Sequence, residues 1–277
     1  MKKSVVFLFL FFVMIITSCG KNEDEYYFAD QIPESNTSEN NDNDVSPKKP
    51  TYSIIGNSIS TFRGYIPSGY KTYYPQPWFR DVNETWWMRI GTLRNMVFLS
   101  NASWSASTVS GNDISCFTSD ERITNLSVNG VPDYIFVAGG TNDYGKNKAL
   151  GTESDENDYN KSTFRGAYSL MLKKMKEMYP NTTIICLSIF PRKEGYDHKN
   201  PNGWTIRVAN DIIKSLADNY NCIYINMEDC GLEDDYSGLT FDGLHPNSKG
   251  MELLALHICK EFDKALIIMN NNMGTND

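Results

Sequence analysis

The sequence predicts an α/β fold, a three-layer α/β/α sandwich built on a five-stranded parallel sheet. Five short apolar runs recur along the chain, and segments with helical periodicity lie between them. Near-continuous apolar runs are typical of strands buried on both faces of a parallel sheet. Strands that alternate with helices indicate a doubly wound sheet, for which five strands favour the flavodoxin-like order 2-1-3-4-5.

The apolar runs and the segments of helical periodicity give the expected strands and helices. The apolar runs cover residues 52–55, 96–99, 134–138, 183–189 and 222–227. Apolar residues three or four positions apart predict helices over residues 84–95, 164–179, 204–220 and 248–268. We therefore expect one domain over residues 51–268, followed by a disordered tail over residues 269–277.

The N-terminal residues have the three parts of a secretory signal, which we assign to residues 1–18. Two lysines precede an unbroken apolar run over residues 5–16, which is too short to span a membrane. The segment ends in Ile16-Thr17-Ser18-Cys19, which resembles a bacterial lipobox. This predicts a lipid anchor on Cys19, and the alternative is an ordinary signal peptide with an incidental cysteine.

Residues 20–50 are poor in large aliphatic side chains and rich in Asn, Ser, Asp and Glu. Such a segment buries too little apolar surface to offset its ordering entropy, so we interpret residues 19–50 as a lipid-anchored flexible tether. The expected location is the bacterial cell envelope. Gly20, where an aspartate would favour inner-membrane retention in some bacteria, favours the outer membrane, with the cell surface as a further option.

Charge and cysteine content exclude several function classes. The net charge of −8 argues against nucleic acid as a partner, and we expect a monomer. No Cys-x-x-Cys pair or cluster of histidines occurs, so no metal site or other cofactor is expected. Cys186 and Cys222 lie in predicted strands and are expected to pack as small apolar residues, although a Cys222–Cys230 disulfide is an alternative.

Polar residues follow the predicted strand ends, where α/β folds place their functional groups. Ser58 follows the first strand, and a run of small residues around Trp104 follows the second. Gly139-Gly140-Thr141-Asn142-Asp143 follows the third strand. Each segment alone could be a helix cap, a serine-rich loop or a tight turn.

Asp242-Gly-Leu-His245-Pro246 follows the fifth strand and completes a possible triad. The Asp242 carboxylate is close enough in sequence to bind one imidazole nitrogen of His245, which would leave the other free as a base for Ser58. The remaining histidines are interpreted differently: His198 as part of a surface loop, and His257 as packing within the last helix.

These residues, in this order, resemble the SGNH (GDSL-type) hydrolase superfamily over about residues 51–266. Gly56-Asn57-Ser58 is similar to its nucleophile block, Ser105-Ala106-Ser107 to its oxyanion-glycine segment, and the Asn142 and His245 segments to its last two blocks. The resemblance implies an acyl-enzyme mechanism with Ser58, His245 and Asp242 as the triad. It also implies an oxyanion hole made by the Ser58 and Ala106 amides and the Asn142 side chain.

The sequence departs from the family pattern at two positions. Asn57 replaces the usual acid but keeps its size and hydrogen bonding. Ala106 replaces a glycine whose backbone amide is the expected oxyanion donor. Alanine can supply that amide only if the backbone angle is not one reserved for glycine.

An aromatic segment over residues 65–87 suggests how a substrate could be recognised. Tyr73 and Trp78 from this segment, with Trp104 and Asp143, are the expected substrate-contacting residues. Aromatic rings there could stack on sugars, which favours an O-acyl, and specifically acetyl, esterase acting on extracellular carbohydrate. The alternatives are an apolar cluster under a long loop, a lipase, lysophospholipase or thioesterase, and a catalytically weak surface glycan-binding lipoprotein.

Overall fold

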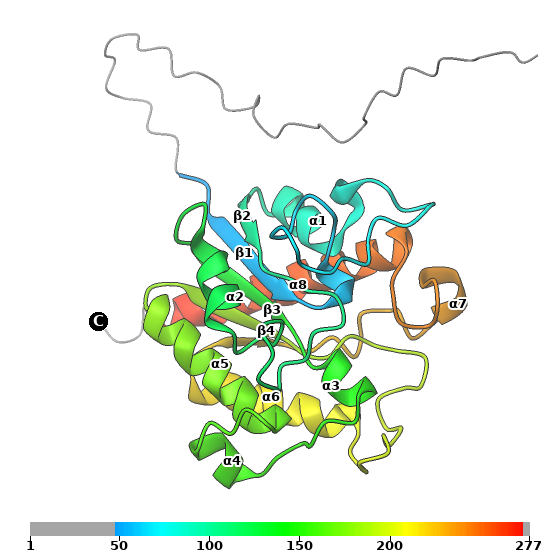
Figure 1. Cartoon of the computed structure of the whole chain (residues 1–277). Helices are drawn as coiled ribbons and strands as arrows, with labels where there is room; N and C mark the ends of the chain where they lie inside the picture. The colour runs from blue at the N-terminus through cyan, green and yellow to red at the C-terminus, as the bar shows by residue number, and fades with distance from the viewer. Residues whose placement is uncertain (1–47, 274–277) are drawn as a thin grey trace, which may run out of the picture. The chain divides into compact units, whose positions relative to one another are not determined.

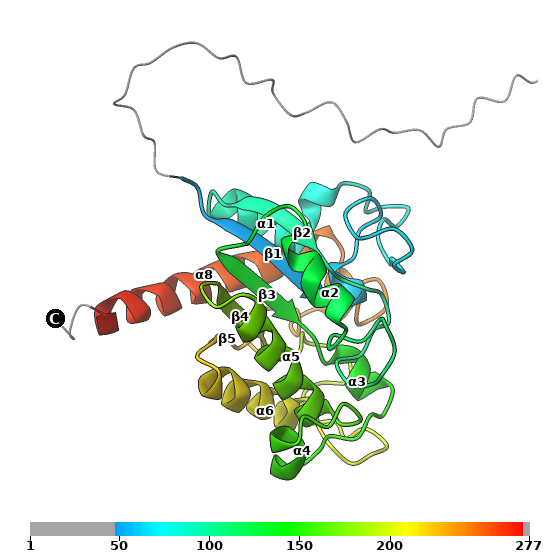
Figure 2. The same cartoon turned by 60° about the vertical axis from the view of Figure 1, so that its left-hand side comes forward.

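The computed structural model describes residues 48–273 of the 277-residue chain. Five parallel strands form one sheet in the order β2-β1-β3-β4-β5, as predicted (Figure 1 and Figure 2). The strands are β1 (Thr51–Gly56), β2 (Val97–Asn101), β3 (Tyr134–Ala138), β4 (Thr183–Leu187) and β5 (Ile223–Ile225). The reversal of strand order beside β1 places the end of β1 at the crevice where α/β sheets bind ligands.

Helices cover both faces of the sheet (Figure 2). α1 (Trp86–Leu93) and α8 (Ser248–Met273) pack on one face, and α5 (Phe164–Met178) and α6 (Ile206–Asn219) on the other. Neighbouring residues of β1 divide between the two cores, since Ile54 packs toward α1 and α8 while Ile55 packs toward α5. This alternation is the reason why the strands are apolar on both faces.

Short elements complete the fold. They are the α-helices α2 (Asp120–Thr124), α3 (Thr141–Gly145), α4 (Glu153–Asn157) and α7 (Tyr236–Leu239), and the 3₁₀ helices η1 (Ser58–Ser60), η2 (Val82–Glu84) and η3 (Asn125–Ser127). None of these was predicted, because a single helical turn is too short to show a hydrophobic period.

Threonine caps set the starts of the main helices. The side chains of Thr85, Thr163 and Thr205 accept hydrogen bonds from backbone amides in the first turns of α1, α5 and α6. A threonine in this position satisfies one of the amides that a helix start leaves unpaired. The caps explain why α1 and α6 each begin two residues later than their apolar pattern predicts.

The predicted end of the last helix was wrong. α8 continues to Met273, so residues 269–273 are helical and do not belong to a tail. No glycine or proline occurs between Gly250, in the first turn of α8, and Gly274, and without such a breaker the helix is free to continue. The predicted signal, Cys19 and the tether up to residue 47 lie outside the described residues, as do residues 274–277.

The alternative of a Cys222–Cys230 disulfide is also wrong, because both residues are free thiols. Cys230 is buried in the core between the sheet and α8, whereas Cys222 packs against the core on the α5 and α6 face. The sheet therefore separates the two sulfurs. Cys222 instead lies beside Cys186 of β4, in the packing role expected for that pair.

Candidate active site

The structure brings together the three residues of the predicted triad. Ser58 opens η1 directly after β1, and Asn57 caps that turn by accepting the Ile59 amide at 3.1 Å. His245 Nε2 lies 2.8 Å from Ser58 Oγ, and His245 Nδ1 lies 2.8 Å from Asp242 Oδ2. Both contacts have hydrogen-bond length, and they form a continuous chain from serine to carboxylate.

Backbone bonds fix the loop that carries His245. The second carboxylate oxygen of Asp242 accepts the Leu244 amide at 3.0 Å and the His245 amide at 2.8 Å. Gly243, between Asp242 and Leu244, has a φ of +83°, a left-handed conformation that glycine adopts without steric penalty. The Asp242 side chain thus shapes the turn and orients the imidazole at the same time.

Tyr73 and Tyr74 also contact the loop that carries His245. The Tyr73 ring stacks on the His245 imidazole at a centroid distance of 3.7 Å and an interplanar angle of 10°. The Tyr74 hydroxyl donates a 2.6 Å hydrogen bond to the Pro246 carbonyl. Tyr73, expected to contact substrate, therefore supports the ring of His245.

Burial favours the neutral form of the imidazole. Desolvation lowers the pKa of His245, and the neighbouring Asp242 opposes this only in part. For Asp242, burial acts to raise the pKa, but the hydrogen bonds and charge of His245 outweigh it and the net pKa is lowered. A neutral imidazole beside an ionised carboxylate is the arrangement in which the histidine can accept a proton.

Ala106 lies in the loop after β2, which the Trp104 amide joins to the end of β1 by a 3.1 Å hydrogen bond to the Gly56 carbonyl. It occupies the third position of a turn closed by a 3.2 Å hydrogen bond from the Ser107 amide to the Trp104 carbonyl. Its φ is +61°, in the left-handed region that favours glycine. Within residues 48–273 its own N–H has no hydrogen-bond acceptor. Alanine therefore presents this amide despite the backbone angle, in a conformation that raises the energy of the folded chain.

Substitution of Ala106 by glycine is expected to stabilise the protein. The left-handed conformation costs a non-glycine residue roughly 1–2 kcal/mol, and the greater freedom of glycine in the unfolded chain offsets about half of that gain. The free energy of unfolding in urea should therefore rise by about 0.5–1 kcal/mol. Ala149→Gly, an exposed position with ordinary φ, should lower it, and an equal loss in both variants would contradict the strain at Ala106.

Asn142 lies beside this turn, in α3. Its Nδ2 donates to the Ser107 carbonyl at 2.9 Å, which occupies one of the two amide hydrogens and leaves the other available. The predicted oxyanion donors Ala106 and Asn142 are thus linked to each other through Ser107.

Asp143, expected to contact substrate, has a different role. It is fully buried and accepts hydrogen bonds from the Val109 amide, the Ser110 amide and the Ser110 hydroxyl at 2.8, 2.9 and 2.7 Å. The prediction was wrong because the adjacent Asn142 and Asp143 point to different surroundings on one helical turn. Asp143 anchors the loop that follows Ala106.

Arg122 is the residue at this site that sequence reasoning missed. It is completely buried and donates to the carbonyls of Gly56, Ala102 and Ser115 and to the Ser107 hydroxyl, at 2.6–3.1 Å. Burial lowers its pKa to about 9. The guanidinium joins the end of β1 to the loop of Ala106. In the sequence it stands in an acidic, polar segment that is typical of a solvated helix.

The other expected substrate contacts divide between surface and core. Trp104 is half-buried, with its ring stacked on Tyr70 at 4.0 Å. Trp78 is 72% exposed and lies 5.8 Å from Phe241, next to Asp242. Tyr74 and Phe79 are buried in the core, so the aromatic segment is an apolar cluster that leaves Trp78 at the surface beside the site.

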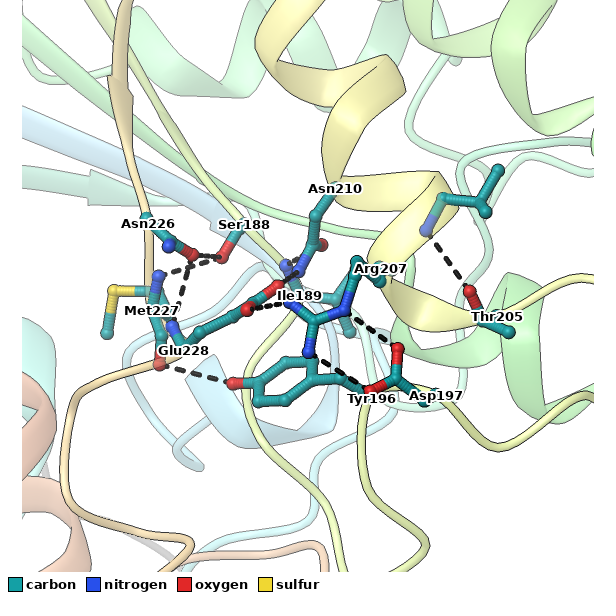
Figure 3. Close-up of polar contacts among 11 residues, drawn as sticks. Ser188, Ile189, Tyr196, Asp197, Thr205, Arg207, Asn210, Asn226, Met227 and Glu228 are labelled. Carbon is teal, nitrogen blue, oxygen red and sulfur yellow. Dashed lines mark hydrogen bonds and ion pairs between the residues drawn. The ribbon is translucent and has the colours of Figure 1, made fainter.

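A polar network joins the segments that follow β4 and β5, at the carboxyl edge of the sheet (Figure 3). Arg207 pairs with Asp197 at 2.7 Å and with Glu228, while Asn210 accepts the Ile189 amide at 2.9 Å. The Arg207 guanidinium is paired with both carboxylates, so we interpret this network as structural. The loop at Asp197 also carries His198, which is exposed as predicted.

His257 is only half-buried and its Nε2 lies 2.7 Å from the Asn226 carbonyl, so it does not simply pack among apolar residues.

Within residues 48–273, no group of three potential metal ligands converges and no helix has the length and hydropathy that a membrane span requires.

A doubly wound sheet with a Ser-His-Asp chain at its carboxyl edge defines an acyl hydrolase of the SGNH type. The chain belongs to the GDSL-like lipase/acylhydrolase family, whose pattern it matches over residues 50–262. A comparison with curated protein sequences found no match.

Solved structures agree with this assignment. The chain is 27% identical to a GDSL-like lipase from Bacteroides ovatus, covering 79% of this chain and 100% of that one with a TM-score of 0.58. It is 25% identical to a GDSL-like lipase from Bacteroides uniformis, covering 78% and 96% with a TM-score of 0.57. An acetyl-xylooligosaccharide esterase from Geobacillus shares the fold at 16% identity, covering 76% and 93% with a TM-score of 0.52.

Proposed function

We propose that this hydrolase removes acyl groups, and specifically acetyl groups, from extracellular carbohydrate by a serine mechanism. The observation that carries the mechanism is the chain of two 2.8 Å contacts from Ser58 through His245 to Asp242. Support for a carbohydrate substrate comes from the exposed Trp78, whose ring lies 5.8 Å from that of Phe241, the residue before Asp242, and from the esterase activity named for the Geobacillus structure.

In the proposed reaction, Ser58 Oγ attacks the ester carbonyl while His245 Nε2 takes its proton. The Ser58 and Ala106 amides and the free Asn142 amide hydrogen stabilise the oxyanion of the tetrahedral intermediate. The imidazolium then gives its proton to the departing sugar hydroxyl, which leaves an acyl-enzyme. A water molecule, deprotonated by His245, releases the acid and restores Ser58.

Asn142→Ala is expected to lower kcat by roughly 10²–10³-fold and to change KM little, because the donor acts mainly on the oxyanion. Initial rates on p-nitrophenyl acetate measure both constants. Asn157→Ala, at an exposed position in α4 with an ordinary φ, is the control and should keep wild-type rates. A tenfold rise in KM at unchanged kcat would contradict the assignment of Asn142 to the oxyanion hole.

The pH dependence should report the lowered pKa of His245. Only the neutral imidazole accepts the Ser58 proton, so kcat/KM should rise with pH as His245 loses its own proton. Since burial lowers the pKa below 6.5, the half-maximal value should lie below pH 6.5, and the profile should level off above pH 7. Rates on p-nitrophenyl acetate from pH 4 to 8 give this profile, and a midpoint above pH 7 would contradict it.

We also propose that the protein is a lipoprotein of the bacterial cell envelope, anchored through Cys19 in the outer membrane and acting as a monomer. The lipobox-like residues 16–19 and the polar residues that follow them support this location. Expression in a bacterium fed a radiolabelled fatty acid should label the wild-type chain and not Cys19→Ser. Label that persists in Cys19→Ser would exclude this cysteine as the anchor.

A substrate screen tests the proposed activity against the lipase, lysophospholipase and thioesterase alternatives. The purified protein should release acetate from acetylated oligosaccharides faster than it hydrolyses medium-chain acyl esters or acyl thioesters. A preference for long acyl chains would overturn the carbohydrate assignment but leave the triad intact. Binding of glycans with no ester hydrolysis at all would favour a binding lipoprotein.

A further inference from the structure

An open pocket of about 390 Å³ begins at Ala106, one of the proposed oxyanion donors. Its lining comes from three separate segments: Lys71 from the loop after η1, residues 104–116 from the loop after β2, and Lys146 and Lys148 at the end of α3. The volume falls within the range that small-molecule sites occupy. Ala106 is the residue that the pocket shares with the proposed catalytic machinery, since Ser58 and His245 are not among its lining residues.

The pocket is positively charged although the chain carries a net charge of −8. Three lysines line it, and Asp113 is the sole acid among its lining residues. The Asp113 carboxylate accepts the Ser115 amide at 2.8 Å and is also attracted by Lys71 and Lys146. One carboxylate against three ammonium groups leaves a net charge of +2 in the pocket.

The three lysines are not equivalent. Lys146 Nζ donates to the Ala106 carbonyl at 2.5 Å and so helps to hold the oxyanion turn. The ammonium groups of Lys71 and Lys148 make no direct hydrogen bond or ion pair within residues 48–273, although their charges act on the carboxylates of Asp113 and Asp143. These two side chains are therefore free to bind a ligand, and their substitution leaves the Ala106 turn intact.

We propose that this pocket binds an anionic group of the glycan, a uronate carboxylate or a sulfate ester, close to the acyl group that Ser58 removes. The inference rests on the proposed carbohydrate esterase function. Ala106 lines the pocket and is also a proposed oxyanion donor, so a substrate whose ester carbonyl is held by the Ala106 amide can extend toward the pocket. Trp104, held by its stacking on Tyr70, supplies an apolar wall for the sugar ring.

The chemistry of the lining indicates how such an anion is recognised. Lysine is a flexible point charge, without the planar fork by which arginine binds carboxylates in pairs. Lys71 and Lys148 should therefore recognise charge and tolerate different anion shapes. Because the pocket is open to water, the attraction should weaken as salt screens it.

The test compares matched substrates on the purified full chain. Acetylated oligogalacturonate and an acetylated sulfated oligosaccharide provide the two anions, and acetylated xylo-oligosaccharide is the neutral reference. Wild type should show a higher kcat/KM on at least one anionic substrate, and the preference should fall as salt is raised to about 0.5 M. The two anionic arms decide between carboxylate and sulfate.

Lysine variants test whether the preference for anionic substrates arises in this pocket. Lys71→Gln/Lys148→Gln should lose roughly three- to tenfold of kcat/KM on the preferred anionic substrate, since each exposed charge pair contributes little. Rates on p-nitrophenyl acetate and the neutral glycan should stay unchanged. Lys214→Gln, an exposed lysine on α6, is the control and should behave as wild type.

The outcomes separate this inference from the proposed function. Equal kcat/KM on neutral and anionic glycans, or a preference that survives in the double variant, would overturn the anion subsite while the carbohydrate esterase stands. Failure to deacetylate any glycan, with p-nitrophenyl acetate still hydrolysed, would overturn both. A salt-sensitive preference that the double variant abolishes would support the inference.

Discussion

Replacement of Ser58 by alanine is expected to lower kcat on p-nitrophenyl acetate by about 10⁶-fold, the loss typical when a serine nucleophile is removed. The Oγ that forms the acyl-enzyme disappears, and no other hydroxyl lies on His245 Nε2 in the described part of the chain. The remaining backbone amides would still bind an oxyanion, so weak catalysis above the uncatalysed rate should persist. Initial rates and burst amplitudes measure the effect.

Ser60→Ala is the matched control for this experiment. Ser60 lies in the same turn, and its buried Oγ has no hydrogen-bond partner among the described residues. Loss of an unpaired buried hydroxyl should leave stability the same or higher, and the rate should stay within a fewfold of wild type. Comparable rates for Ser58→Ala and wild type would sink the nucleophile assignment.

Substitution of Asp242 by asparagine is expected to lower kcat by about 10⁴-fold at neutral pH. The amide can keep the oxygen that accepts the Leu244 and His245 amides, so the turn should persist. The substitution removes the negative charge that stabilises the imidazolium formed when His245 takes the Ser58 proton. Because Asp242 raises the pKa of His245 against the effect of burial, the midpoint of the pH profile should also move further down.

Asp235→Asn provides the comparison for this second change. Asp235 caps α7 in the same long loop by accepting the Gly238 amide at 2.9 Å, and asparagine is an equally good cap. Its rate should match wild type. A loss in Asp242→Asn accompanied by lowered thermal stability and an unshifted pH midpoint would indicate that Asp242 only shapes the loop.

The fold was predictable because each strand carries its own signal. Strands 134–138 and 183–187 lie within the apolar runs that identified them, and the helix patterns located α5 almost to the residue. The triad could be proposed because a serine, and a histidine three residues after an aspartate, each follow a strand end. Short helices such as α3 escaped prediction because one turn holds too few residues to show a period.

The sequence by itself determined the α/β class, the strand order and the identity of the residues that meet at the sheet edge. Tertiary structure alone decided what surrounds them. It turned Asp143 inward, buried Arg122 against four acceptors, and gave Ala106 a φ of +61°. Periodicity records which side of an element is apolar, whereas these features depend on contacts between segments far apart in the chain. The Ala106 amide is therefore positioned by contacts that no local sequence pattern predicts.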